Sequence, residues 1–229
     1  MPLDYLEVAC KLSQLKRRLS RLIYQSSTSN GARINLSAVS SALASLSEWY
    51  AELPPHMCDY RQVASFHHRS VAILHLQYWR AVSFATRPFL LYSVSQGRKT
   101  DDAKQRSFDE FGTMCLDAAR NSVEIISFLH DRDLLSSLVP LDCTCILECM
   151  QVFVLALADT NSSEHLEAIR TCLRALQGME QILWPKHALT EVMAQLEEHG
   201  IWDGGDVLVP AGMGTSGLMF LDVVPSNEL

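Results

Sequence analysis

The sequence lacks the excess of basic residues that nucleic-acid-binding domains carry. Its 229 residues include 19 lysines and arginines against 26 aspartates and glutamates, which gives a formal net charge of −7. A protein that binds a phosphate backbone normally presents a positive field. The charge balance therefore argues against the whole chain being a nucleic-acid-binding module.

Targeting and catalytic motifs are also missing. The first residues, MPLDYLEVACKLSQLKRRL, lack the basic start, the continuous apolar stretch and the small-residue cleavage site of a signal peptide. The sequence contains no H-E-x-x-H zinc motif, no G-x-S-x-G nucleophile elbow and no phosphate-binding loop. We therefore expect an intracellular protein that is not an enzyme and that holds no cofactor.

The seven cysteines lack the pairing of a structural metal site. Cys143, Cys145 and Cys149 are spaced C-x-C-x-x-x-C, whereas zinc ligands usually come as C-x-x-C with a second pair downstream. We expect reduced thiols packed inside the protein, and no bound metal.

One apolar run, residues 141–159, approaches the length of a bilayer span. Glu148 and Gln151 lie in its middle, and a charged residue at that depth in a membrane is costly. The run therefore predicts a helix in the core of a protein and no membrane association.

Helical periodicity is the main signal that the sequence does contain. Apolar residues recur every three or four positions, and we find neither internal repeats nor strands alternating with helices. The predicted helices cover residues 5–22, 36–53, 66–91, 108–129, 141–159, 166–183 and 187–199. The pattern predicts an all-α, multi-helix bundle of about seven helices in residues 1–199, followed by an irregular, glycine- and proline-containing tail in residues 200–229.

The one concentrated basic run is Lys16-Arg17-Arg18, extended by Arg21. Such a run is compatible with a patch for nuclear import or for phosphate contact. The simpler interpretation, which we favour, is the solvated face of an amphipathic helix.

The segment LHLQYWRAVSFATRPFLLY, residues 74–92, places Arg87 beside Pro88 near the end of a predicted helix. Proline removes a backbone donor and clashes with the preceding turn. We expect the helix to bend or loosen there, to turn Phe89 and Leu90 inward, and to leave Arg87 for a carboxylate or a helix C-terminus.

The same segment resembles the fungal-specific transcription factor domain, the middle homology region of fungal zinc-cluster regulators. The W-x-x-x-L-P core at Trp49, Leu53 and Pro54 and the segment CLDAARNSVEII at residues 115–126 are similar to its flanking parts, so the resemblance covers about residues 3–198. The family pattern L-x-L-x-Y followed by R-P-F-L is matched by Leu74, Leu76, Tyr78, Arg87, Pro88, Phe89 and Leu90.

This resemblance implies a nuclear, helical regulatory domain of a fungal transcription regulator that controls metabolic or secondary-metabolite genes. Full members of the family carry a six-cysteine zinc cluster upstream, whereas Cys10 and Cys58 are isolated here. We therefore expect a truncated regulator, or one without its own DNA-binding part. Its expected partners are other transcription-regulatory proteins or a second copy, with a small-molecule effector as a further candidate, and no sequence-specific DNA binding by this chain alone.

Two alternatives from other classes stay open. A small-molecule receptor would hold a metabolite inside the bundle. An all-α enzyme would need polar residues converging in the interior, and the apolar stripes contain almost none. The side chains that could line a receptor pocket, although core packing explains them more simply, are Trp79, Phe84, Met114, Met150 and Phe153.

Overall fold

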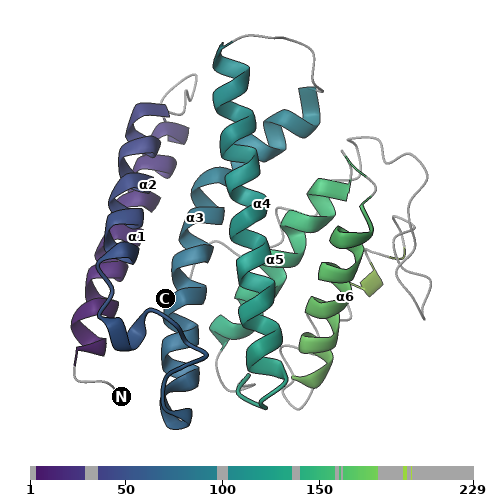
Figure 1. Ribbon diagram of the computed structural model, residues 1–229. Helices are drawn as coiled ribbons and strands as arrows, with labels where there is room; N and C mark the ends of the chain where they lie inside the picture. Colours follow the sequence, from purple (N-terminus) through teal and green to yellow (C-terminus); the bar gives the residue numbers. More distant parts are fainter. Residues whose placement is uncertain are drawn as a thin grey trace.

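The computed structural model describes residues 4–28, 36–96, 103–135, 140–157, 160, 162–179, 193–194 and 197. These residues contain no strand, which confirms the predicted all-α class. Most of the seventh predicted helix, at 187–199, and the whole of the predicted tail, at 200–229, lie outside them. The elements, shown in Figure 1, are α1 (Tyr5–Thr28), α2 (Leu36–Ala51), the 3-10 turns η1 (Pro55–Met57) and η2 (Ser65–His67), α3 (His68–Gln96), α4 (Ala103–His130), α5 (Pro140–Leu157) and α6 (Ser163–Gly178).

Consecutive helices run in opposite directions. The indole Nε1 of Trp49, near the end of α2, donates a hydrogen bond of 3.3 Å to the carbonyl of Val8, near the start of α1. The hydroxyl of Ser93, near the end of α3, donates to a carboxylate oxygen of Asp109 in the first part of α4 at 2.7 Å. As a result α1, α3 and α5 point one way and α2, α4 and α6 the other (Figure 1).

Helix α3 is the centre of the bundle. It contacts α1, α2, α4 and α5, and its side chains are buried on several sides, including Val71, Leu76 and Val82. A helix that is apolar nearly all round is stable only when other helices surround it. The apolar character of α3 on several sides therefore accounts for its central position.

Aromatic rings join α2 to α3. Tyr50 stacks on Tyr78 with 4.1 Å between ring centroids, and Trp49 stacks on the same ring at 5.9 Å. The hydroxyl of Tyr50 is hydrogen-bonded to Nδ1 of His75 at 2.8 Å. Offset aromatic pairs add to the free energy of apolar burial. This aromatic cluster therefore holds α1 and α2, which form an antiparallel pair, against α3.

The apolar run of α5 packs inside the protein, as predicted. Every residue from Val152 to Leu157 is buried, and Pro140 occupies the first helical position, where its missing donor costs nothing. Of the helices that the structure describes, none combines the length and the hydropathy needed to cross a bilayer.

Helix α3 continues through Pro88 and ends at Gln96, so the predicted end at residue 91 is wrong. Figure 1 shows the last part of α3 leaning away from the direction of its first part. The hydroxyl of Thr86 also donates to the carbonyl of Val82 at 2.8 Å, a bond that favours bending. Phe89 and Leu90 are buried as expected, and the ring of Phe89 packs against two phenylalanines of α4.

Other helix ends also differ from the prediction. α1 and α4 are longer than their apolar stripes, because the stripe marks only the buried turns of a helix. α6 is shorter than predicted and ends at Gly178, where an added Cβ would lie 3.1 Å from the ring of His130. The close approach of α4 therefore favours glycine at the end of α6.

The packing of α5 gives a direct test of the core. Phe153 is 0% exposed and Phe66 is 78% exposed. We expect Phe153→Ala to lower the free energy of unfolding by about 3–5 kcal/mol, because a large apolar side chain is lost and a cavity remains. Phe66→Ala should change it by less than about 0.5 kcal/mol. Urea denaturation of both variants checks this, and equal losses would contradict the packing described.

Candidate functional site

The cysteines of α5 are packed as neutral thiols. Cys143, Cys145 and Cys149 are all buried, as predicted. Burial raises the pKa of Cys143 to about 11 and the pKa of Cys145 to about 12. Nucleophiles and metal ligands need the thiolate form, so these side chains are unsuited to either role. Among the described residues no group of three or more histidines, cysteines, aspartates and glutamates is placed to hold a metal ion.

Two cysteines depart from the expectation of buried thiols. Cys10 on α1 and Cys58 after η1 are exposed. The Sγ atom of Cys58 lies 3.3 Å from the carbonyl of Leu53 and 3.4 Å from that of Pro54. This thiol therefore helps to close the end of α2.

The histidines and the aromatic set of the receptor hypothesis are dispersed. His75 bridges Tyr50 and the carbonyl of Met57, whereas His68 packs against Phe128. Trp79 lies beside Tyr50, and Phe153 lies beside His165 of α6. Phe84 is partly buried, Met150 is buried and Met114 is exposed. In the described part of the chain, the contacts of these five side chains do not place them around one common pocket.

A cavity of about 580 Å³ lies at the end of the bundle where α1 begins. The Nε2 atom of His56 is 3.7 Å from a carboxylate oxygen of Asp4 there, and Asp59 accepts hydrogen bonds from the backbone N–H of Arg61 and the side chain of Gln62. The lining residues are Asp4, Pro55, His56, Asp59, Gln62, Val63, Ala64 and His67. Asp59 is already used in its own turn, whereas Nδ1 of His67 is buried and has no hydrogen-bond partner in the described part of the chain.

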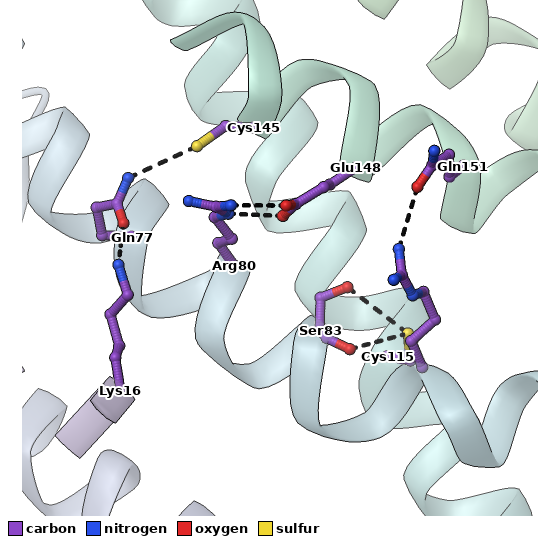
Figure 2. A network of polar contacts seen from close by, with 9 residues as sticks. Lys16, Gln77, Arg80, Ser83, Cys115, Cys145, Glu148 and Gln151 are labelled. Atoms are coloured by element: carbon purple, nitrogen blue, oxygen red, sulfur yellow. Dashed lines mark hydrogen bonds and ion pairs between the residues drawn. The ribbon is translucent and has the colours of Figure 1, made fainter. Parts of the chain in front are cut away.

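The basic run at the start of the chain is divided by the fold. Arg17, Arg18 and Arg21 are exposed, as the solvated-face interpretation predicts. Lys16 is partly buried instead, and its ammonium donates to Oε1 of Gln77 on α3 (Figure 2). The interpretation of Lys16 as a solvated residue is therefore wrong.

Lys16 belongs to a row of polar side chains between α1, α3 and α5, which we call the polar seam. The residues of the seam that belong to α3 are spaced by eight, three and seven positions in the sequence, and this spacing keeps them close to one side of the helix. On α5 they follow steps of three. The seam consists of Lys16, Arg69, Gln77, Arg80, Arg87, Asp142, Cys145, Glu148 and Gln151.

The centre of the seam is a two-pronged ion pair. Nε and Nη2 of Arg80 donate to the two carboxylate oxygens of Glu148, each at 2.6 Å (Figure 2). The two side chains are 25% and 19% exposed. Burial alone would lower the pKa of Arg80, but the hydrogen bonds and the charge of Glu148 outweigh it and raise that pKa. Paired donors of this kind give both strength and a fixed geometry.

One end of the seam is held by the way α4 terminates. Asp133 adopts φ 53°, and the N–H groups of Asp133 and Leu134 bond back to His130 and Leu129, the pattern of a Schellman cap. This cap presents the carbonyl of Leu134 to Nη1 of Arg69 at 2.7 Å.

The same guanidinium nitrogen of Arg69 lies 2.8 Å from Oδ2 of Asp142. The side chain of Asp142 is fully buried. It lies in the first turn of α5, where a negative charge also interacts favourably with the helix dipole. Arg69 therefore has a carboxylate partner.

In the part of the chain that the structure describes, Lys16 and Arg87 have only amide partners. Nη1 of Arg87 donates to Oε1 of Gln151 at 3.1 Å, so the predicted carboxylate or helix C-terminus is wrong. Gln77 accepts from Lys16 through Oε1, and its Nε2 donates to Sγ of Cys145 at 3.6 Å. Burial lowers the pKa of Lys16, and the charge of Arg80 lowers it further.

The seam therefore carries more positive than negative charge. It contains four cations, Lys16, Arg69, Arg80 and Arg87, and only two carboxylates. The expectation of an interior almost free of polar groups is wrong. The signal that could have found the seam is the presence of Arg80 and Glu148 within apolar helices, because opposite charges placed in buried segments must find each other.

Removing the acid of the central pair should destabilise the protein. Glu148→Gln leaves the partly buried Arg80 facing a neutral amide, and we expect a loss of about 2 kcal/mol in the free energy of unfolding. Glu124→Gln is the control, since Glu124 pairs with Arg61 on the surface, and should cost less than about 0.5 kcal/mol. Urea denaturation measures the free energy of unfolding of both variants. Equal losses would contradict the larger contribution to stability that we assign to the central pair.

The pH dependence of stability should report the buried charge of Lys16. At neutral pH the wild type carries the cost of the desolvated ammonium, so Lys16→Met should be at least as stable. That advantage should narrow as pH rises from the lowered folded pKa toward the ordinary value of 10.5, because the wild-type lysine then loses its proton. Cys145 and Glu148 act in the opposite direction to Arg80 but do not cancel the shift.

Lys11→Met is the control for this measurement, made by thermal or urea denaturation over pH. Lys11 is exposed, and its hydrogen bond and charge pair with Glu7 raise its pKa. The small contribution of Lys11 to the free energy of unfolding should make the wild type more stable than Lys11→Met at neutral pH, and this difference should disappear at high pH. The stability difference therefore has the opposite sign to that expected for Lys16→Met. A pH-independent difference between the wild type and Lys16→Met would show that Lys16 is not desolvated.

Comparison with known proteins gives no relative on which a function could be based. The sequence matches no protein-family model, and neither a curated protein nor a solved structure matches it. The resemblance to the fungal regulatory domain therefore stays a prediction that rests on the motif residues alone.

Proposed function

We propose that the chain is a regulatory and interaction domain of a fungal transcription regulator. In this proposal it works in the nucleus on metabolic or secondary-metabolite genes, has no DNA-binding zinc cluster of its own and catalyses no reaction. The observation that carries the proposal is the position of the residues that resemble the family. Trp49 and Tyr78, from two separate motifs, stack on each other where α2 meets α3.

The remaining motif residues support the same proposal. Leu53 is buried where α2 ends, and Pro54 precedes the 3-10 turn η1. Phe89 packs into α4, and Arg87 ties α3 to α5. Positions that join separate helices are those that a shared fold would preserve, so a common architecture explains why these motifs occur together.

An interaction role is supported by apolar side chains on the surface. Leu91 and Tyr92 on α3 and Met114 on α4 are exposed, and α3 and α4 pack along each other. Exposed apolar side chains that are neighbours, as Leu91 and Tyr92 are in the chain, are typical of surfaces that contact other proteins. The partners in this proposal are other transcription-regulatory proteins or a second copy of the chain.

A second candidate function is that of a receptor for a small-molecule effector. The excess positive charge of the polar seam favours this function, because a buried cation without an acidic partner can recognise an anion. The two functions are compatible, since an effector bound in the seam would act on the domain that contacts the partner.

A tethering experiment tests the regulatory function. We expect the full chain, fused to an unrelated DNA-binding domain, to change transcription of a reporter that carries the matching DNA sites. The same fusion with Phe153→Ala should lose the effect, because the core that shapes the surface is disrupted. The purified chain alone should give no sequence-specific shift of DNA in a gel. An expressed wild-type fusion without effect, or a sequence-specific gel shift by the chain alone, would contradict the proposal.

A further inference from the structure

Lys16 is one of two cations of the polar seam, with Arg87, that contact a neutral amide instead of a carboxylate in the described part of the chain. Arg69 and Arg80 each contact a carboxylate, whereas the ammonium of Lys16 donates to the amide oxygen of Gln77. No carboxylate lies within ion-pair distance of Lys16 among the residues that the structure describes. A partly buried ammonium that meets only a neutral acceptor lacks the partner that usually compensates for its lost hydration.

The position of Lys16 on its helix makes the choice of residue informative. Lys16 lies four residues after Leu12 and three before Leu19, and both leucines are buried. An apolar residue at position 16 would therefore continue the buried stripe of α1 without any charge cost. A lysine at this position is explained if its positive charge binds a negatively charged ligand.

Arg80 supplies a second donor beside Lys16. Its Nε and Nη2 atoms are occupied by Glu148. Figure 2 shows the third nitrogen of this guanidinium pointing away from Glu148, toward the side of α3 where Gln77 meets Lys16. The ammonium of Lys16 contacts Gln77, which lies three residues before Arg80 on α3, so the two cations approach neighbouring turns of the same helix. The charge of Arg80 also lowers the pKa of Lys16.

We propose that Lys16, Gln77 and Arg80 form a binding site for the carboxylate group of a small organic acid. This inference deepens the receptor function proposed above and depends on it for its biological role, while the binding itself can be measured directly. In the bound state the ammonium of Lys16 and the free nitrogen of Arg80 donate to the two carboxylate oxygens. The amide of Gln77 turns to donate as well.

The local charge favours a monoanion. Lys16, Arg80 and Glu148 together carry one net positive charge, so a single carboxylate leaves the group neutral. A phosphate dianion would leave excess negative charge near Glu148, where the repulsion is weakly screened. Water reaches this part of the seam, because the side chain of Arg80 is partly exposed, and the proposed acid enters from this exposed side.

The test measures binding to the purified full chain at neutral pH. Sodium acetate, sodium hexanoate and sodium phosphate are each compared with sodium chloride at equal ionic strength, by thermal denaturation and by titration calorimetry. We expect a saturable rise in the melting temperature of the wild type with at least one of the two carboxylates. Lys16→Arg and the surface control Lys11→Met should keep the response, and Lys16→Met should bind at least about tenfold more weakly, a difference of about 1.4 kcal/mol.

Three results would overturn the site. They are no saturable response to either carboxylate in the wild type, an undiminished response in Lys16→Met, and a stronger response to phosphate than to both carboxylates. The helical circular dichroism of Lys16→Met must match the wild type, and Lys16→Gln replaces it if it does not. If the wild type binds no carboxylate but its tethered fusion still changes reporter transcription, only this binding site is rejected. If the wild type binds a carboxylate but its tethered fusion has no effect, the regulatory function is rejected.

Discussion

The ion pair between Arg80 and Glu148 determines how α3 and α5 lie against each other. Both partners reach from helices whose buried side chains are mostly apolar, and both pairs of hydrogen-bonding atoms are engaged. A purely apolar contact between two helices tolerates sliding by a turn, because similar side chains meet in each register. A two-pronged ion pair in a partly buried position does not, since a shift would leave two charges without partners. The parallel packing of α3 and α5 around α4 therefore depends on this contact.

Most of the fold could be predicted from apolar spacing alone. The burial of α5 and the central place of α3 follow from helices that are apolar on several sides, and the inward turn of Phe89 follows from the proline beside it. The helix ends could not be predicted as well. Spacing shows which turns are buried, whereas the real ends depend on contacts such as that between Gly178 and His130.

The polar seam was not predicted from the sequence. Lys16 stands in a row of basic residues, so composition groups it with Arg17 and Arg18, although its spacing from Leu12 places it on the buried side of α1. Arg87 was expected to find a carboxylate or a helix C-terminus, and it contacts Gln151 instead. A residue's partner on a distant helix depends on the register of packing, which no local pattern of one helix contains.

The placement of the cysteines has a consequence for how the protein meets oxidants. Five thiols are buried, and those of Cys143 and Cys145 are held neutral, whereas oxidation proceeds through exposed thiolates. Cys10 and Cys58 alone face solvent. The five buried thiols are therefore poorly reactive toward peroxide and disulfide reagents. Any redox signal that acts on the cysteines must act at Cys10 and Cys58.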